Sequence, residues 1–328
     1  MATLAGRLLI AIFISTMTIG PAMRPLTSSL LSLSLLLASC KPNQEPAVSN
    51  APADGVNSAI VTVNYPLQYM AERLVRDAVD VQFPAPADED PAFWQPDDAA
   101  IATFQNARLI LMNGATYSKW ADKVSLPASK VVDTSAAFRD RFIKIEQATT
   151  HSHGPGGEHS HAGTAFTTWI DFDQAARQAE AVAAAVSKSW PDLAPQVEKN
   201  LASLVADLQA LDQRMQVVGN RIAGAPLVAS HPVYHYWARR YGINLQSVLW
   251  EPETVPNDKA MQELQTLLGQ HPAKWMIWEG EPAKESVAKL EALAVKSIVF
   301  DPCGNVPEEG DFMTVMKANV AALEKAFP

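Results

Sequence analysis

Cysteine is scarce in this chain of 328 residues, which contains only Cys40 and Cys303. Two cysteines exclude both a disulfide framework and a cysteine-rich zinc module. Runs of basic residues are missing as well, and the formal net charge of −9 argues against nucleic acid as the main partner. The hydrophobic fraction of 48% is ordinary for a globular protein, so the chain can bury a core, and its length predicts two domains.

Familiar catalytic motifs are also missing from the sequence. There is no G-x-S-x-G, no Walker A pattern, no G-x-G-x-x-G after a strand, no H-E-x-x-H and no C-x-x-C. These absences leave no residue to nominate as a nucleophile or a general base. They therefore favour a binding protein over an enzyme.

The first 39 residues read as a signal peptide and not as part of a fold. Residues 29–38 are a short apolar stretch preceded by Arg24, too short to span a bilayer as a mature helix. The stretch ends in Leu-Ala-Ser directly before Cys40, which resembles the lipobox of bacterial lipoproteins, whose cysteine is acylated. We therefore expect an exported protein that is held at the membrane through a lipid on Cys40. A plain signal peptide with a coincidental cysteine is the alternative.

Two kinds of pattern follow the signal peptide. Residues 40–57 are rich in proline, asparagine, alanine and serine and show no periodicity, which predicts a flexible tether. From Ser58 on, short apolar runs alternate with segments of helical spacing. Such alternation is typical of βαβ units and a parallel sheet.

A long helix-forming stretch divides this alternation into two regions. Residues 171–223 are dense in alanine, leucine, glutamine and acidic residues, and Pro191 and Pro195 divide them into two helices of unequal length. The sequence therefore predicts an α/β fold with two lobes, 58–170 and 224–328, each a mainly parallel sheet flanked by helices, joined by a long helical backbone. Ligands of open α/β sheets bind outside the carboxyl ends of the strands, so the cleft between the lobes is the expected site.

A histidine-rich segment interrupts the first lobe. Residues 148–163 read ATTHSHGPGGEHSHAG, carry four of the seven histidines and have no apolar face, which predicts a low-complexity loop. Imidazole is the commonest metal ligand, so His151, His153, His159 and His161 are candidates for a low-affinity collecting or sensing site. A solvated loop without a specific role is the alternative. Metal binding by such a loop should weaken below pH ~6.5, where imidazoles protonate.

Two polar residues directly follow strand-like runs in the second lobe. His231 follows the first of these runs and opens a helix expected from Pro232, and Asp301 follows the last run. An imidazole and a carboxylate at the tips of neighbouring parallel strands can converge on one cation, and this mixture suits zinc or a similar divalent metal. His235 lies four residues past His231 on the expected helix, so it is a further candidate on the same face. Taken singly, a helix cap, a core histidine and a turn-forming aspartate explain these residues equally well.

The segment around His231 gives the chain a family resemblance. Residues 230–242, SHPVYHYWARRYG, resemble the S-H-x-x-F/Y-x-Y-x-A-x-x-Y-G segment of zinc/manganese ABC-importer substrate-binding proteins. The Y-P-L at Tyr65, the W-I-D at 169–171 behind the histidine-rich loop, and the V-F-D-P at 299–302 fit that family in order. The resemblance implies a solute-binding lipoprotein that holds a divalent cation in the cleft and delivers it to a permease and its ATPase. Zinc is the expected cation, with manganese or another divalent metal as alternatives.

The ligand set that the resemblance implies is incomplete in this chain. Members of the family hold the metal with three histidines and an aspartate, or with two histidines, a glutamate and an aspartate. His231 matches the third position and Asp301 the acidic one, but Ala92 stands at the first position and Thr167 at the second. Because zinc almost always takes four ligands in closed sites, the loop histidines or His235 would have to complete the set.

Other readings stay open on the sequence alone. A changed cargo, such as a chelated metal or an organic ligand, would find Phe93 and Trp94 lining an apolar pocket, although core packing explains these aromatic residues too. Cys303 beside Asp301 would add a soft ligand as a thiolate, although a buried inert thiol is commoner. The alternative class of function is a surface-anchored scaffold or metal-buffering lipoprotein that keeps the fold but has lost or changed the cleft ligand.

Overall fold

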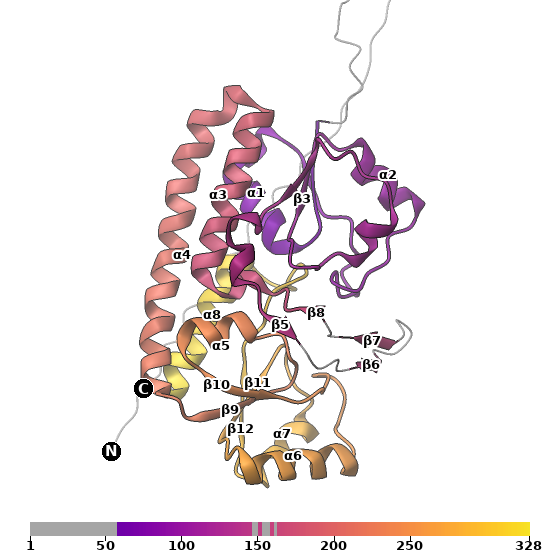
Figure 1. Cartoon of the computed structure of the whole chain (residues 1–328). Helices are drawn as coiled ribbons and strands as arrows, with labels where there is room; N and C mark the ends of the chain where they lie inside the picture. Colours follow the sequence, from indigo (N-terminus) through magenta and orange to yellow (C-terminus); the bar gives the residue numbers. More distant parts are fainter. Residues whose placement is uncertain (1–57, 146–149, 153–157, 161–162) are drawn as a thin grey trace, which may run out of the picture. The chain divides into compact units, whose positions relative to one another are not determined.

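Two four-stranded parallel sheets organise the residues that this computed structural model describes, which are 58–145, 150–152, 158–160 and 163–328. The strand order is β2-β1-β3-β4 in the first sheet and β10-β9-β11-β12 in the second (Figure 1). The strands of the first sheet are β1 (Ile60–Thr62), β2 (Val81–Gln82), β3 (Leu109–Met112) and β4 (Val131–Asp133). Those of the second are β9 (Pro226–Ala229), β10 (Asn244–Ser247), β11 (Trp275–Trp278) and β12 (Lys296–Val299). The predicted α/β fold with two parallel sheets is confirmed.

Helices flank both sheets, and α1, α2, α6 and α8 begin at residues whose side chains cap them. The first sheet carries α1 (Tyr65–Val75) and α2 (Asp98–Asn106), and the second carries α5 (His235–Tyr241), α6 (Asp258–Gln270), α7 (Lys284–Glu291) and α8 (Phe312–Ala326). Side-chain oxygens at the helix starts accept backbone N–H groups that would otherwise lack a partner. The capping residues are Asn64, Asp97, Asn257 and Asp311.

An antiparallel pair of long helices, α3 (Phe172–Ser189) and α4 (Ala194–Ile222), connects the two sheets (Figure 1). Pro191 starts the single 3-10 turn between them and Pro195 lies in the first turn of α4, where a missing N–H costs nothing. With 29 residues, α4 is roughly 43 Å long. It packs against α1 near the first sheet and against α5 and α8 near the second, so one rigid element contacts both lobes. No helix in the described ranges is long and apolar enough to cross a membrane.

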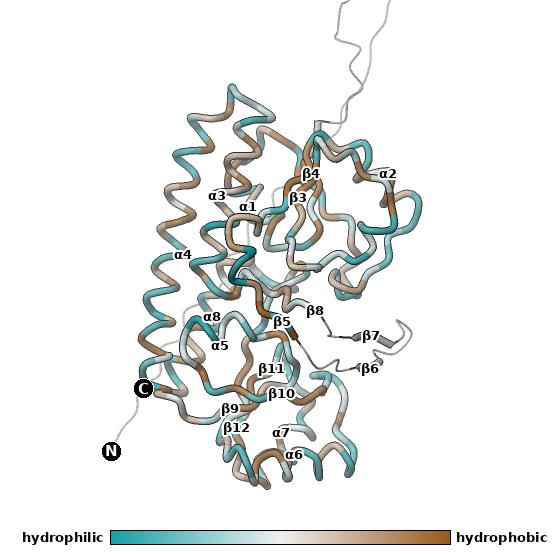
Figure 2. The backbone as a smooth tube through the Cα atoms, viewed as in Figure 1, coloured by the Kyte–Doolittle hydropathy of each residue, from teal (hydrophilic) through white to brown (hydrophobic). Residues whose placement is uncertain are grey.

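The hydrophobic core is continuous from the first sheet through the helix pair to the second sheet. Val61 and Ile110 of the first sheet, Leu204 of α4 and Phe300 after β12 all belong to one buried cluster. A smaller cluster around Trp278 fills the space between the second sheet, α6 and α7. Figure 2 shows the corresponding pattern, with brown in strand β3 and alternating teal and brown stretches along α4. The two lobes and the helix pair therefore share one hydrophobic core.

The segment after β9 differs from the sequence prediction. The helix expected from Pro232 begins only at His235, because the preceding residues form turns. The carbonyl of Val233 accepts a hydrogen bond from the Thr167 hydroxyl instead of a helical N–H group. His231 therefore precedes α5, and the inference that His235 shares a helical face with it is wrong.

The histidine-rich segment is more ordered than its composition predicts. Strand β6 (Thr150–Ser152) pairs with β7 (Glu158–Ser160) in an antiparallel ladder that sets His151 opposite His159. The segments that flank it in the sequence, β5 (Lys144–Ile145) and β8 (Gly163–Thr164), also pair with each other. The prediction of an irregular loop is therefore wrong for these strands, because short runs around a glycine- and proline-rich stretch are typical of a hairpin. His153 and His161 lie outside the described residues, as do the signal peptide, the tether and Cys40.

The contact between α4 and α5 leads to a stability prediction. Gly219 of α4 packs so closely on the end of α5 that an added Cβ would lie 2.4 Å from the backbone oxygen of Tyr241. Gly219→Ala should therefore lower the free energy of unfolding by about 1–3 kcal/mol, measured by urea denaturation. Gly269→Ala in α6 is the control, since a Cβ there meets no atom within 4 Å, and it should be neutral or stabilising by up to about 1 kcal/mol. Equal effects of the two substitutions would contradict the packing argument.

Candidate metal centre

Polar residues follow all four strands of the second sheet at its carboxyl edge. His231 comes two residues after β9 ends, Glu251 lies in the segment that leaves β10, Glu279 directly follows β11, and Asp301 comes two residues after β12 ends. Because parallel strands have their carboxyl ends on one edge of a sheet, these side chains gather there.

Three of these side chains form a compact cluster. His231 Nδ1 lies 3.2 Å from Glu279 Oε1 and 3.6 Å from Glu251 Oε1, and one ligand atom from each of the three residues lies within 4.8 Å of the others. The imidazole is buried, with 3% of its side chain exposed, whereas about a quarter of each carboxylate side chain is exposed (25% for Glu251 and 24% for Glu279). In a tetrahedral site with metal–ligand bonds of about 2.0–2.2 Å, neighbouring ligand atoms are roughly 3.3–3.6 Å apart. The two distances from the imidazole are close to that spacing.

Negative charge is concentrated at the carboxyl edge of the second sheet. The pKa of Glu279 is raised well above its ordinary value. Burial is the largest cause, and the negative charges of Glu251, Asp90 and Asp301 raise it further. Burial likewise raises the pKa of Asp301, although the hydrogen bond that its carboxylate accepts from the Cys303 N–H opposes the shift. Carboxylates that disfavour one another's charge would all be stabilised by one divalent cation between them. The cluster therefore has the electrostatics of a cation site.

A cavity of about 430 Å³ lies in front of the cluster, with walls from both lobes. Its acidic wall belongs mainly to the second sheet, with Asp90 added from the first lobe. The acidic lining residues are Asp90, Glu251, Glu253, Glu279 and Asp301. The first lobe also contributes Tyr117, Phe166, Thr167 and Trp169 to the lining. The cavity lining thus combines five carboxylates with three aromatic residues.

Hydrogen bonds between the lobes hold the two walls together. The Trp169 indole N–H donates to the carbonyl of Pro302 over 2.7 Å. The Asn305 side-chain amide donates to the carbonyls of Pro86 and Glu89, over 2.7 and 2.8 Å, at the start of the turn that carries Asp90. Asn305 therefore holds the turn that carries Asp90, the acidic residue that the described part of the first lobe contributes to the cavity lining.

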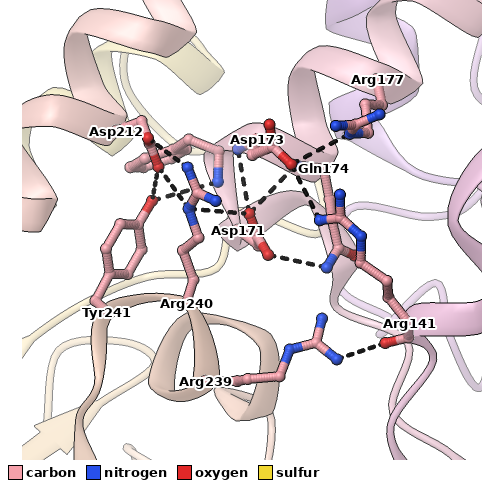
Figure 3. A network of polar contacts seen from close by, with 10 residues as sticks. Arg141, Asp171, Asp173, Gln174, Arg177, Asp212, Arg239, Arg240 and Tyr241 are labelled. Carbon is pink, nitrogen blue, oxygen red and sulfur yellow. Dashed lines mark hydrogen bonds and ion pairs between the residues drawn. The ribbon is translucent and has the colours of Figure 1, made fainter.

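A second polar network holds α5 in place behind the cluster (Figure 3). Arg240 of α5 forms a two-pronged ion pair with Asp212 of α4, at 2.6 and 3.0 Å, and its guanidinium lies 3.7 Å from Asp171 at the start of α3. The Tyr241 hydroxyl donates to Asp212 over 2.9 Å. Since α5 begins four residues after His231, its attachment to α3 and α4 also limits the movement of the imidazole.

The residues predicted from the sequence lie in different places. His231 is in the cluster, and Asp301 is in the cavity wall but outside the three-residue group. His235, half-buried at the start of α5, belongs neither to that group nor to the cavity lining among the described residues. Thr167 lines the cavity, and Ala92 is buried and contributes no ligand atom.

The aromatic residues expected to line an apolar pocket do not line this one. Trp94 packs edge-on against Trp120 with ring centroids 6.3 Å apart, and neither Trp94 nor Phe93 is among the residues that line the cavity. Core packing is therefore the better account of them. Cys303 is buried, and burial raises the pKa of its thiol far above its ordinary value, with the charge of Asp301 adding to the shift. Neither burial nor this shift favours a thiolate ligand.

Sequence reasoning missed Glu251 and Glu279. Glu279 could have been found, because it directly follows the apolar run that forms β11, as Asp301 follows the run that forms β12. Glu251 carried no comparable signal, since it stands among prolines and acidic residues after the end of β10.

Comparisons with known proteins point in one direction. The family model described as zinc-uptake complex component A, periplasmic, matches residues 60–326. The high-affinity zinc uptake system protein ZnuA of Bacillus subtilis is 27% identical over 308 residues, which are 88% of this chain and 93% of that protein. The zinc-binding lipoprotein AdcA of Streptococcus pneumoniae is 25% identical over 305 residues. That match covers 89% of this chain and 60% of AdcA, so the chain spans well under the full length of that relative.

Solved structures share the fold at lower sequence identity. The Zn(II)-bound ZnuA-like domain of S. pneumoniae AdcA superposes with a TM-score of 0.69 at 20% identity, covering 83% of this chain and 99% of that domain. At this identity the similarity supports the arrangement of two sheets and a long helix pair, and says nothing about individual ligands.

The contact made by Asn305 leads to a prediction about the cavity. Asn305→Ala removes two hydrogen bonds between the lobes, so it should lower the free energy of unfolding by about 1–2 kcal/mol and speed amide hydrogen exchange in residues 86–94. Asn244→Ala is the matched control, because its amide donates only to the nearby Gly224 carbonyl over 3.3 Å. Unchanged exchange in residues 86–94 after Asn305→Ala would show that other contacts hold that turn.

Proposed function

Because the chain belongs to the family of the periplasmic zinc-uptake complex component A, we propose that it is the solute-binding component of a zinc ABC importer. It captures Zn²⁺ in the cavity between the lobes and delivers the ion to a permease and its ATPase. The observation that carries this proposal is the cluster of His231, Glu251 and Glu279, whose ligand atoms already lie at distances suited to one ion.

Each residue of the cavity edge has a distinct role in this proposal. His231 supplies the nitrogen ligand through Nδ1, and Glu251 and Glu279 supply carboxylate oxygens. Asp301 stands in the adjacent wall and completes the set when the ion draws the carboxylates together. Asp90 belongs to the first lobe and lines the same cavity, so attraction between its carboxylate and the bound cation would link the two lobes.

The function is capture and not catalysis. The N-terminal segment and Cys40 would export the chain and anchor it through a lipid, which keeps the binding lobes near the permease. The histidine-rich segment, residues 148–163, would collect zinc at lower affinity than the cluster, whose ligand atoms already lie close together. These parts of the proposal rest on the sequence and on the family, in which the named relatives are zinc-uptake or zinc-binding proteins.

Zinc titration by calorimetry on residues 41–328 tests the proposal. His231→Ala should weaken zinc binding by roughly 100-fold or more, because it removes the only nitrogen ligand of the described cluster. Deletion of residues 151–161 should leave tight binding intact, because the cluster lies outside that segment. The control is His271→Ala, since this histidine contacts the Leu227 carbonyl at 2.8 Å, away from the cavity.

The opposite pattern would replace the proposal with its alternative. In that pattern zinc binding is weak, is lost when residues 151–161 are deleted, and is unaffected by His231→Ala. In that case the cleft is not the cargo site. The protein would then be a metal-buffering lipoprotein that acts through its histidine-rich segment.

A further inference from the structure

Buried amide and hydroxyl side chains gather at the carboxyl edge of the first sheet. Asn113 directly follows β3 and stands at their centre, because its Oδ1 accepts hydrogen bonds from the side-chain amides of Asn64 and Gln178, both over 3.2 Å. Gln178 in turn donates to the Thr134 hydroxyl over 3.0 Å and accepts from the Thr168 hydroxyl over 3.0 Å. These five residues, the amide hub, are each at most 1% exposed. Since a buried polar group without a partner is costly, each member of the hub holds the others in place.

The amide hub is attached to part of the cavity lining. Residues 166–169, the wall segment, supply three of the residues that line the cavity between the lobes. Asn113 Nδ2 donates to the Phe166 carbonyl of this segment over 2.9 Å. Thr168 is the member of the segment that does not line the cavity, and its hydroxyl donates to Gln178 in the hub. The wall segment is therefore fixed to the first lobe at two points, once through its backbone and once through a side chain.

The wall segment in turn contacts two loops of the second lobe that carry candidate ligands. Thr167 donates through its hydroxyl to the backbone carbonyl two residues after His231. Trp169 donates through its indole N–H to the carbonyl of the residue that directly follows Asp301, over 2.7 Å. The position of the wall segment therefore constrains where this imidazole and this carboxylate can lie around one ion.

The centre of the hub and the metal cluster occupy equivalent places in the two lobes. The two sheets have the same strand order, with β1 and β3 in the places of β9 and β11. Asn64 comes two residues after β1 ends, as His231 does after β9, and Asn113 directly follows β3, as Glu279 follows β11. A distance of 3.2 Å separates the paired side chains in each lobe, as an amide hydrogen bond in the first and as an imidazole beside a carboxylate in the second. Neutral amides satisfy one another without an ion, whereas the carboxylates of the second lobe need a cation to offset their charge.

Resting on the function proposed above, we propose that Asn113 is a positioning residue for zinc capture and that the amide hub preforms one side of the cavity. The hub holds the wall segment in place before the ion arrives. The wall segment then keeps the loops beside His231 and Asp301 near the positions that they take around the ion. Because less ordering is left to be done on binding, the hub raises the affinity for zinc without contacting the ion.

Two threonines of the hub provide a matched pair of substitutions. Thr168→Val and Thr134→Val each remove a hydroxyl that bonds to Gln178, in both cases from a fully buried side chain. Both should lower the thermal unfolding temperature by a similar amount, but only Thr168 belongs to the wall segment. Zinc is titrated by calorimetry into residues 41–328, with and without residues 151–161, so that the histidine-rich segment does not contribute. Thr168→Val should raise the dissociation constant by about fivefold or more, whereas Thr134→Val should leave it within about twofold of the parent value.

Asn113→Asp tests the centre of the hub. The substitution keeps the Oδ1 acceptor for Asn64 and Gln178 but places an oxygen where an N–H group donated to the Phe166 carbonyl, so the wall segment loses its backbone attachment. Amide hydrogen exchange in residues 166–169 of the zinc-free protein should become faster in Asn113→Asp and Thr168→Val, and not in Thr134→Val. The visible absorption spectrum of bound Co²⁺ reports ligand geometry, which a general loss of stability would not change. The spectrum should shift in the same two variants and stay unchanged in the third. If either of the two fails to fold, the other carries the comparison.

The zinc titrations separate this inference from the function on which it rests. If zinc binds tightly and depends on His231, but Thr168→Val and Thr134→Val change the dissociation constant equally, the hub acts only through stability. The inference is then overturned and the proposed function stands. If exchange in residues 166–169 becomes faster while the dissociation constant is unchanged, the position of the wall segment does not matter to the ion, which also overturns the inference. If the protein without residues 151–161 binds no zinc, the proposed function fails together with the inference.

Discussion

Carboxylates held close together at the carboxyl edge of the second sheet impose an electrostatic constraint on this fold. The carboxylates of Glu251 and Glu279 both lie within 3.6 Å of Nδ1 of the buried His231 imidazole. Further carboxylates line the same cavity. Without a cation, bringing these carboxylates together is unfavourable, because each ionised carboxylate makes ionisation of its neighbours more costly. The fold must therefore supply the rigidity that keeps these groups in place.

This rigidity comes mainly from the helices α3, α4 and α5. The helix pair α3 and α4 packs against both lobes, and Arg240 and Tyr241 attach α5 to Asp212 of that pair. His231 is thus held between a buried strand on one side and an anchored helix on the other. On the first lobe, Asn305 fixes the turn that carries Asp90. Arg240, Tyr241 and Asp212, which lie outside the cavity lining, thereby help to set its geometry together with Asn305, which is part of that lining.

Much of this architecture could be predicted from periodicity and from the positions of proline and histidine. The parallel sheets and the long helix pair follow from alternating apolar runs and from the helix-forming stretch around Pro191. The strand-end rule also pointed to His231 and Asp301, and it would have pointed to Glu279 had it been applied to every strand. Glu251 could not be found in this way, because its approach to His231 depends on how the chain turns after β10. The start of α5 was misplaced because a tertiary contact, from Thr167 to the Val233 carbonyl, prevailed over local helical preference.

Helices from the two ends of the folded region, α1 and α8, pack against each other. Tyr69 of α1 packs on Phe312 at the start of α8, with ring centroids 5.5 Å apart, and the Tyr65 N–H donates to the Gly304 carbonyl. Contacts between residues so distant in sequence form late, because a large loop must close before they are made. The packing around α1 in the first lobe is therefore complete only when the residues of α8 are present. A chain truncated before Phe312 would lose part of the contacts of α1 together with α8 itself.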